Sequence, residues 1–180
     1  MWYPATVTVA PVAEPVTLTE AKAHCAIEDT SRDIELAIYI AAARSYVESY
    51  CGIQLSSRTV AVMCDSFADF DSFPIVPLSS VSGITYVDTN GSTQTLSTSV
   101  YEVRSDGLTV SIALKYNQVW PAIQDGSRIT VTAVTGGNVP EAVKHALLLL
   151  IAQSVDNIEP VKAGETNVDW LLCNHRAFTA

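Results

Sequence analysis

The spacing of hydrophobic and polar residues changes twice along this chain of 180 residues. Apolar residues recur every three or four positions between residues 16 and 52, which is the period of an α-helix. They alternate with polar residues through residue 137, and helical spacing returns after residue 138. The pattern predicts an α+β fold: a helical bundle, an inserted lobe of antiparallel β-hairpins and an extended C-terminal tail.

These changes divide the chain into four predicted parts. Residues 1–15 form an extended N-terminal arm, and residues 16–56 together with 138–159 form the helical bundle. Residues 57–137 form the inserted β-rich lobe, and residues 160–180 form a tail that docks on another surface. A chain of this length can bury a core of its own, so we expect one folded unit with an insertion.

Two helix starts follow each other closely at the beginning of the bundle. Thr17 and Glu20 have the spacing of a capping box. In this motif the threonine oxygen accepts a free N–H of the first turn, and the glutamate binds the N–H of the cap residue. Thr30 and Asp33 repeat the spacing. We therefore expect a short helix, a tight acidic turn, and a second helix capped by Thr30.

The second helix is expected to run from about Ser31 to Cys51, with Gly52 as its C-terminal cap. Its apolar residues form two rows along the helix. The first row is Leu36, Ile40, Ala43, Val47 and Tyr50, and the second row is Ile34, Ala37, Ile38 and Ala41. A face this wide predicts packing on two sides, either within the bundle alone or in part against another subunit.

The middle of the chain carries the sequence signals of hairpins. The alternation in RTVAVMC and SRITVTAV predicts strands. An Asn-Gly pair at 90–91 and an Asp-Gly pair at 106–107 each stand between two strand-like runs, as in tight hairpin turns. Tyr116 and Trp120 lie in a loop that either folds onto the sheet or forms a contact patch.

A third helix is predicted in VPEAVKHALLLLIAQSVDN, with Pro140 in its first turn. The consecutive apolar residues Leu147 to Ile151 cover its whole circumference. We expect this helix to be covered on all sides, by the rest of the chain or by a neighbouring subunit. The last segment contains a short apolar cluster of Trp170, Leu171, Leu172 and Phe178.

Charge and hydropathy narrow the possible functions. Ten Lys and Arg residues against nineteen Asp and Glu residues give a net charge of -9, which disfavours tight binding to nucleic-acid phosphates. An acidic surface does allow DNA to pass without being held. The longest apolar run, Ala146 to Ala152, is too short to cross a bilayer, so we expect no membrane insertion.

Candidate chemistry is sparse. The chain contains none of the motifs of zinc proteases, serine hydrolases, phosphate loops or dinucleotide turns, so we expect no enzyme activity and no cofactor. The three histidines, His24, His145 and His175, are scattered along the chain. The acidic cluster of Asp65, Asp69 and Asp71 lacks the glycine and terminal glutamate of a calcium loop, and we expect a solvated loop there.

The four cysteines are Cys25, Cys51, Cys64 and Cys173. Their spacing contains no C-x-x-C pair, so the sequence predicts neither a zinc site nor a dithiol redox site. We expect reduced thiols in a cytosolic protein, with a disulfide between Cys25 and Cys51 as the alternative.

The helical pair, the segment YNQVWP and the third helix follow one another in an order that resembles the head-tail connector (adaptor) proteins of long-tailed bacteriophages, prophages and gene transfer agents. The resemblance covers Pro15 to Asn157, and the tail VDWLLCNHRAF is also similar to the leucine-rich end of the family. The most specific positions are Leu18, Glu20, Ala21, Lys22, Ile40, Ala41, Ala42, Ala43, Val47, Glu48 and Tyr50.

This resemblance implies a structural virion protein of the neck, between capsid and tail, that assembles in the host cytoplasm. Such a protein forms a ring of twelve copies that joins the portal protein to a stopper or tail-completion protein. DNA passes through the lumen of the ring without specific binding. An oligomeric ring also agrees with a chain whose predicted helices carry more apolar surface than a monomer covers.

Two sets of contact residues are expected. Docking on the portal is assigned to the tail residues Trp170, Leu171, Leu172, His175, Arg176 and Phe178. Contacts between copies are assigned to the helix residues Tyr39, Ala43, Tyr46, Val47, Leu148 and Ile151. Two alternatives stay open: another neck component, such as a stopper or tail terminator, and a cytosolic α+β ligand-binding module, which needs a deep pocket with convergent polar groups.

Overall fold

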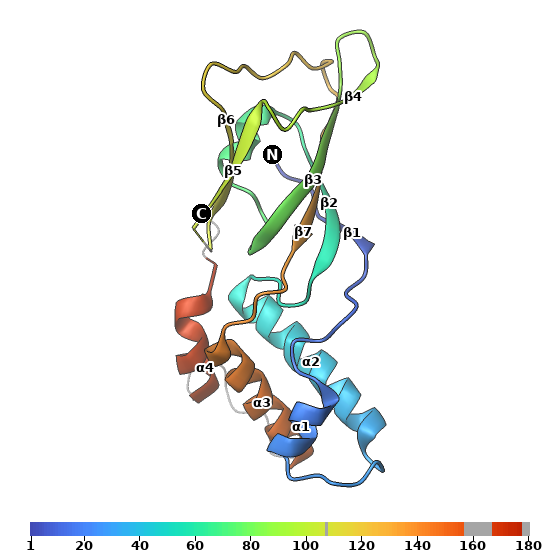
Figure 1. The fold of residues 1–180 in the computed structure, drawn as a ribbon, viewed down its shortest axis with the longest axis vertical. Coiled ribbons are helices and arrows are strands. Elements are labelled where there is room, and N and C mark those ends of the chain that lie inside the picture. The colour runs from blue at the N-terminus through green and yellow to red at the C-terminus, as the bar shows by residue number, and fades with distance from the viewer. Residues whose placement is uncertain (107, 157–166, 178–180) are drawn as a thin grey trace.

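A computed structural model describes residues 1–106, 108–156 and 167–177 of the chain. The protein consists of two lobes stacked along one long axis, a β lobe of strands and a helical lobe (Figure 1). A short N-terminal strand is followed by two helices, then by a run of antiparallel strands, and further helices form the C-terminal part. The predicted α+β class is therefore confirmed.

The helical lobe is built around two long helices. Helix α2 packs on α3, α3 packs on α4, and the short α1 contacts both α2 and α3. The helices are α1 (Leu18–His24), α2 (Asp33–Cys51), α3 (Glu141–Val155), α4 (Asn167–Leu172) and the short 3-10 helix η2 (Cys173–His175). Within the described residues, these helices are too short or too polar to span a bilayer.

The first predicted helix cap is confirmed and the second is wrong. Thr17 accepts the N–H of Glu20, whose carboxylate accepts the N–H of Thr17 in return. At the start of α2, by contrast, Arg32 occupies the cap position and makes no side-chain cap bond. The Asp33 carboxylate instead accepts a hydrogen bond from Lys22 Nζ at 2.7 Å, which joins α1 to α2. Asp33 therefore pairs with Lys22 of α1 instead of forming the predicted cap with Thr30.

Helix α2 buries only one of its two apolar rows. Leu36, Ile40, Ala43 and Val47 of the first row lie in the core, and Gly52 ends the helix in the left-handed conformation, as predicted. Ile34, Ala37 and Ile38 of the second row are exposed, and Ala41 is half-buried. Of the two alternatives, cover of both rows by the bundle alone is wrong, because α1 and α3 pack on the same side of α2.

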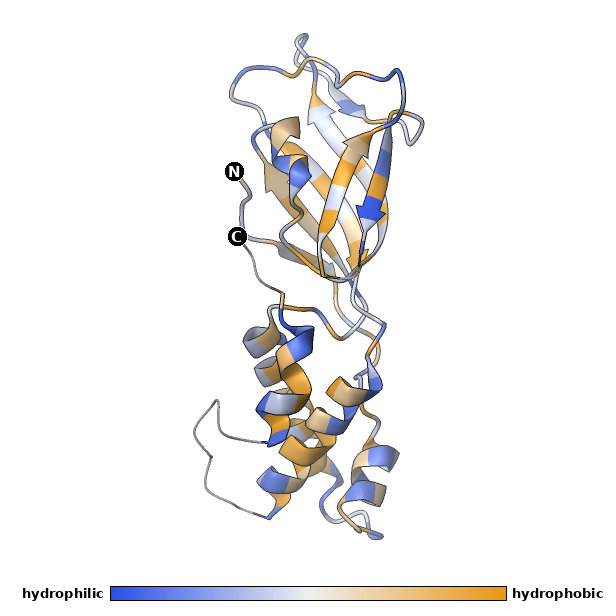
Figure 2. Ribbon diagram, turned by 90° about the vertical axis from the view of Figure 1, so that its left-hand side faces the viewer, coloured by the Kyte–Doolittle hydropathy of each residue, from blue (hydrophilic) through white to orange (hydrophobic). Residues whose placement is uncertain are grey.

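The β lobe contains a five-stranded antiparallel sheet and a separate hairpin. The sheet has the order β1-β2-β7-β3-β4, and its strands alternate in hydropathy (Figure 2). The strands are β1 (Thr6–Val9), β2 (Arg58–Cys64), β7 (Ile129–Thr135), β3 (Leu78–Val87) and β4 (Thr93–Thr95). The hairpin consists of β5 (Tyr101–Ser105) and β6 (Val110–Leu114), and the 3-10 helix η1 (Phe67–Asp71) contacts β6.

Both predicted hairpins are confirmed by strand pairing, β3 with β4 and β5 with β6. The core of the lobe lies between the sheet, the hairpin and η1, where Phe70 and Ile129 are fully buried. Trp120 stacks on Phe67 with ring centroids 4.7 Å apart. Of the two loop aromatics, Trp120 thus folds onto the lobe, whereas Tyr116 is 99% exposed.

Residues 1–15 are not wholly an extended arm. Thr6–Val9 form strand β1, which pairs with β2 at the edge of the sheet. The Trp2 indole N–H donates to the carbonyl oxygen of Ser72 at 2.7 Å. The sequence TVTV has the β-branched alternation of a strand, which is the signal for this element. The N-terminal residues therefore belong to the β lobe.

A polar network joins the two lobes near the C-terminal end of α2. The Glu48 carboxylate accepts hydrogen bonds from Arg58 at 2.6 Å, from Arg44 at 3.0 Å and from the N–H of Leu55 at 2.9 Å. Arg44 also donates to Glu14 at 2.7 Å. Only 10% of the Glu48 side chain is exposed, so each of its contacts forms with little competition from water. The network fixes β2 and the arm against α2.

Candidate functional site

The described part of the C-terminal segment packs on the helical lobe of its own chain. Val168 and Leu172 of α4 are buried, and α4 contacts α3. The N–H of Ala177 donates to the carbonyl oxygen of Cys51 at 2.7 Å, which anchors the segment to the end of α2. The segment is thus folded and docked within the chain, whereas the sequence led us to expect an extended tail.

A polar cluster holds this segment against α2. Asp169 is only 7% exposed and accepts a hydrogen bond from the hydroxyl of Tyr50. Desolvation, this hydrogen bond and the charge of Asp169 hold the pKa of Tyr50 above its usual value. The Arg176 guanidinium lies 4.8 Å from the centroid of the Tyr50 ring. Tyr50 therefore contacts the segment with both its hydroxyl and its ring.

The residues predicted to dock on the portal occupy different environments. Trp170 is 79% exposed, Arg176 is exposed, and Leu171 and His175 are half-buried. Leu172 is fully buried in the core and has no surface to offer a partner. Phe178 lies outside the described residues. Among the described residues of this segment, Trp170 is the largest apolar side chain exposed to solvent.

The residues predicted to contact another copy also divide into two groups. Ala43, Val47 and Ile151 are buried inside the helical lobe, because these positions face the contact between α2 and α3. We therefore no longer assign them to a contact between copies. The members with accessible surface are Tyr39, Tyr46 and Leu148. Tyr46 is held in place by stacking on Tyr50, and the Tyr39 hydroxyl donates to Glu35 at 2.6 Å.

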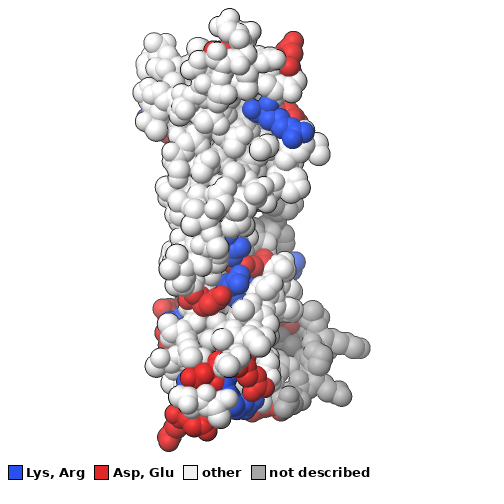
Figure 3. Space-filling view, turned by 90° about the vertical axis from the view of Figure 1, so that its right-hand side faces the viewer, with Lys and Arg blue, Asp and Glu red and all other residues white. Residues whose placement is uncertain are grey.

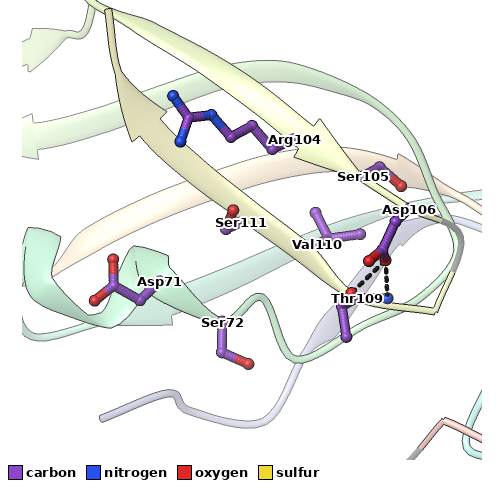
Figure 4. Close-up of a pocket in the computed structure, with 8 residues that line it drawn as sticks. All are labelled: Asp71, Ser72, Arg104, Ser105, Asp106, Thr109, Val110 and Ser111. Carbon is purple, nitrogen blue, oxygen red and sulfur yellow. Dashed lines mark hydrogen bonds between the residues drawn. The ribbon is translucent and has the colours of Figure 1, made fainter.

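A hollow of about 380 Å³ in the β lobe is lined by polar side chains. Figure 4 shows that the charged groups of Asp71, Arg104 and Asp106 lie on different sides of it. Arg104 Nε donates to Glu102 at 2.8 Å. Hydrogen bonds from the Thr109 side chain and backbone hold the pKa of Asp106 below its usual value, which makes it a weak general base. The lining residues include neither a histidine nor a cysteine, and the hydroxyl beside the weakly basic Asp106 is that of Thr109.

Histidines and acidic residues do not assemble a metal site in the part of the chain that the structure describes. The His24 and His145 rings lie 6.4 Å apart at the surface between α1 and α3. His175 lies on η2, in the C-terminal segment. Asp69 caps η1 through the N–H of Ser66 at 3.1 Å, a structural role within the acidic loop.

All four cysteines are free thiols, so the alternative disulfide between Cys25 and Cys51 is not formed. Burial raises the pKa of Cys51 to about 11 and the pKa of Cys64 to about 12. Both thiols stay protonated at neutral pH and are therefore poor nucleophiles. They act as apolar core residues.

Charged side chains are unevenly distributed over the surface. Figure 3 shows one face of the molecule, on which the β lobe is mostly free of charged residues while Asp, Glu, Lys and Arg gather over the helical lobe and the junction. The second apolar row of α2 adds two exposed isoleucines, Ile34 and Ile38, to the surface of the helical lobe. The sequence contained the signal for this exposed row, because apolar residues surround α2 on more than one side.

Comparison with known proteins gives a family and a fold. Residues 14–157 match the family model of the head completion protein. No curated protein sequence matches the chain. Among solved structures, a chain of the neck of an empty gene transfer agent particle, computed with C6 symmetry, is 20% identical, with a TM-score of 0.80 over 99% of this chain and 97% of that chain. A chain of the neck of the native particle, computed with C12 symmetry, is 19% identical, with a TM-score of 0.77 over 99% and 97%.

Proposed function

Because this chain belongs to the head completion protein family, we propose that it is a structural protein of the virion neck, a head-tail connector or adaptor. In this role it forms a ring between the portal and a stopper or tail component, and DNA passes through the ring. The observation that carries the proposal is the likeness of the whole fold to chains of gene transfer agent necks computed with C6 and C12 symmetry.

The charge of the chain fits this role. Each chain has a net charge of -9, so the ring has an acidic surface. Such a surface repels the DNA phosphates and does not hold the DNA. On the face that Figure 3 presents, the basic side chains lie mostly beside acidic ones, whereas a DNA-gripping protein needs clustered Lys and Arg residues.

We assign the portal contact to the exposed side of the C-terminal segment, with Trp170 at its centre and Leu171, His175 and Arg176 around it. Tryptophan is enriched among the residues that contribute most to binding at the centre of an interface, and Trp170 is largely exposed here. We assign Tyr39, Tyr46 and Leu148 to contacts within the ring. Phe178 stays a proposed contact residue by its sequence alone.

The experiment mixes the purified full chain with the portal of its own particle and follows complex formation by sedimentation and electron microscopy. We expect rings of this chain on the portal, and Trp170→Ala to weaken portal binding about 30-fold, as for loss of an interface tryptophan. Deleting the whole segment is a poorer test, because it also removes the core residues Val168 and Leu172.

Tyr116→Ala is the matched control, since it also removes an exposed aromatic side chain but from the β lobe. It should bind the portal as the wild type does. Binding to a tail component without binding to the portal would identify the chain as a stopper. Binding to neither would refute a role in the neck.

A further inference from the structure

One side of α2 is exposed and carries no charge along the length of the helix. Ile34 is 82% exposed and Ile38 is 62% exposed. Apolar side chains of this size stabilise a protein only when they are removed from water, so at these positions they contribute little to folding. Five of the residues on this side, Ile34, Ile38, Ala42, Ser45 and Ser49, follow one another at intervals of four and three, which places them in line, and the half-buried Ala41 lies beside them. This α2 stripe consists of Ile34, Ile38, Ala41, Ala42, Ser45 and Ser49.

The opposite side of α2 is already used by the fold. Leu36, Ile40, Ala43 and Val47 are buried toward α1 and α3, so the stripe points away from the helical lobe. Among residues 1–106, 108–156 and 167–177, none covers Ile34 or Ile38 enough to bury it. The exposure therefore reflects a helix with apolar residues on two sides and neighbours on one.

Local helix stability does not explain the isoleucines. Isoleucine is β-branched and has a lower helix propensity than Glu, Lys or Ala. Any of these three residues would therefore stabilise an exposed helix position better than isoleucine does. The alanines and serines that continue the stripe are small, so another backbone can approach α2 closely there. Both features suit a covered surface.

The charges beside the stripe are neutralised within the chain. Glu35 accepts hydrogen bonds from Arg32 at 2.8 Å and from Tyr39 at 2.6 Å. Glu48 is bound by Arg44 and Arg58. A partner that covers the stripe therefore does not have to supply cations to compensate for a buried carboxylate.

Charge also limits which partner can cover it. Two copies that each carry a net charge of -9 repel each other, and the repulsion is smallest where the touching surfaces have no charge. The stripe contains no charged residue, whereas Figure 3 shows charged side chains gathered over the helical lobe. It thus meets the electrostatic requirement for contact with an identical acidic chain.

We propose that the α2 stripe is the lateral contact of the ring and that a second copy of this chain covers it. The inference rests on the proposed function, because a ring brings copies side by side. Ring closure joins two different surfaces, so the stripe of one copy meets another face of the next. This moves the contact on α2 from the buried Ala43 and Val47 to the opposite side of the helix.

The first test introduces a charge into the stripe. We expect Ile38→Glu to leave the circular dichroism spectrum and the Tm of the full chain unchanged, and to raise the concentration needed for ring formation at least tenfold in analytical ultracentrifugation. Val12→Glu is the control, because Val12 is 97% exposed and lies outside α2. It adds the same charge and should leave assembly unchanged.

The outcomes separate this inference from the proposed function. Wild-type rings together with equally stable rings of Ile38→Glu would overturn the role of the stripe and leave the neck role intact. A wild type that forms no ring, with or without portal, would overturn both. An Ile38→Glu chain that fails to fold would show that the stripe is covered within the chain, which also contradicts the proposal.

A second measurement identifies what covers the stripe. Ile38 is replaced by a benzophenone amino acid, the assembled ring is irradiated, and the products are analysed by mass spectrometry. We expect a crosslink between two copies, at a surface different from the stripe. A crosslink to residues 157–166 of the same chain, or to another neck protein, would overturn the proposal.

Discussion

The two lobes differ in how completely each covers its own apolar residues. In the β lobe, the sheet, the β5–β6 hairpin and η1 enclose a core in which Phe70 is fully buried against Trp2, Phe67 and Trp120. In the helical lobe, α2 has neighbours on one side, and Ile38 on its other side is exposed. The same chain thus contains a self-contained lobe and an incompletely covered one.

The difference follows from the geometry of the elements. A strand presents its apolar residues on one face, so a second layer on that face covers them all. A helix with apolar residues around most of its circumference needs neighbours on more than one side. The helical lobe buries only part of the apolar surface of α2, so partner surfaces are expected on this lobe.

The largest expected effect comes from removing a core side chain of the β lobe. Phe70→Ala should lower the free energy of unfolding by about 3–5 kcal/mol, because the ring is fully buried and the space it leaves stays partly empty. Urea unfolding followed by tryptophan fluorescence measures this loss, since Trp2 and Trp120 contact the ring.

The matching change in the helical lobe is Ile38→Ala. It should change the free energy of unfolding of the isolated chain by about 0.5 kcal/mol or less, because the side chain is already in water and alanine is the better helix former. Similar decreases in the free energy of unfolding for Phe70→Ala and Ile38→Ala would mean that the two lobes bury these apolar side chains equally well.

An intermediate effect is expected where the lobes meet. Glu48→Gln keeps an oxygen for the N–H of Leu55 but removes the charge that faces Arg44 and Arg58. Arg58 would then lie partly buried without its counter-ion, while Arg44 keeps Glu14, at a cost of about 2–3 kcal/mol in the free energy of unfolding. Thermal and urea unfolding should show the loss, and a second unfolding transition if the network is what couples the lobes.

Glu28→Gln is the control for the network, because Glu28 is exposed in the turn between α1 and α2. It should be neutral within about 0.5 kcal/mol. A loss for Glu48→Gln no larger than this would show that the network does not stabilise the junction.

Most of the fold could be predicted because its signals are local. The change from helical to alternating spacing gave the order of the elements, and the Asn-Gly and Asp-Gly pairs gave two hairpins. Strand β1 was missed, since its four residues lie in a six-residue stretch between Pro4 and Pro11 that carries a short signal, and its partners in β2 are fifty or more positions away.

The candidate surfaces could be predicted only in part. Sequence periodicity told us that α2 is apolar on two sides, but only the packing of α1 and α3 decides that Leu36 and Val47 are covered and Ile34 and Ile38 are not. Likewise, the apolar tail cluster was visible in the sequence. That Leu172 turns inward and Trp170 outward depends on α4 docking on α3.

The two capping motifs show the same limit, and one of them gives a further prediction. Thr17 and Glu20 form their cap through one carboxylate oxygen of Glu20, while Lys144 of α3 binds the other oxygen, so the ion pair and the cap coexist. At the second motif, Asp29 accepts the N–H of Ser31 at 2.9 Å, and Asp33 is engaged by Lys22. A spacing rule cannot see such competitors.

Glu20 should therefore stabilise the helical lobe in a pH-dependent way. The hydrogen bond from Lys144 and those from the Thr17 backbone and hydroxyl lower the pKa of Glu20 from 4.5 to about 2 in the folded protein. A lowered pKa means that the contribution is complete above pH 4.5 and is lost as the pH falls toward 2. Since 40% of the Glu20 side chain is exposed, screening by water limits the contribution to about 0.5–1 kcal/mol. Glu20→Gln should be less stable than the wild type by this amount at pH 6 and equally stable near pH 2, as measured by urea unfolding at both values. A difference that stays constant with pH would mean that the neutral cap, rather than the charge, stabilises the start of α1.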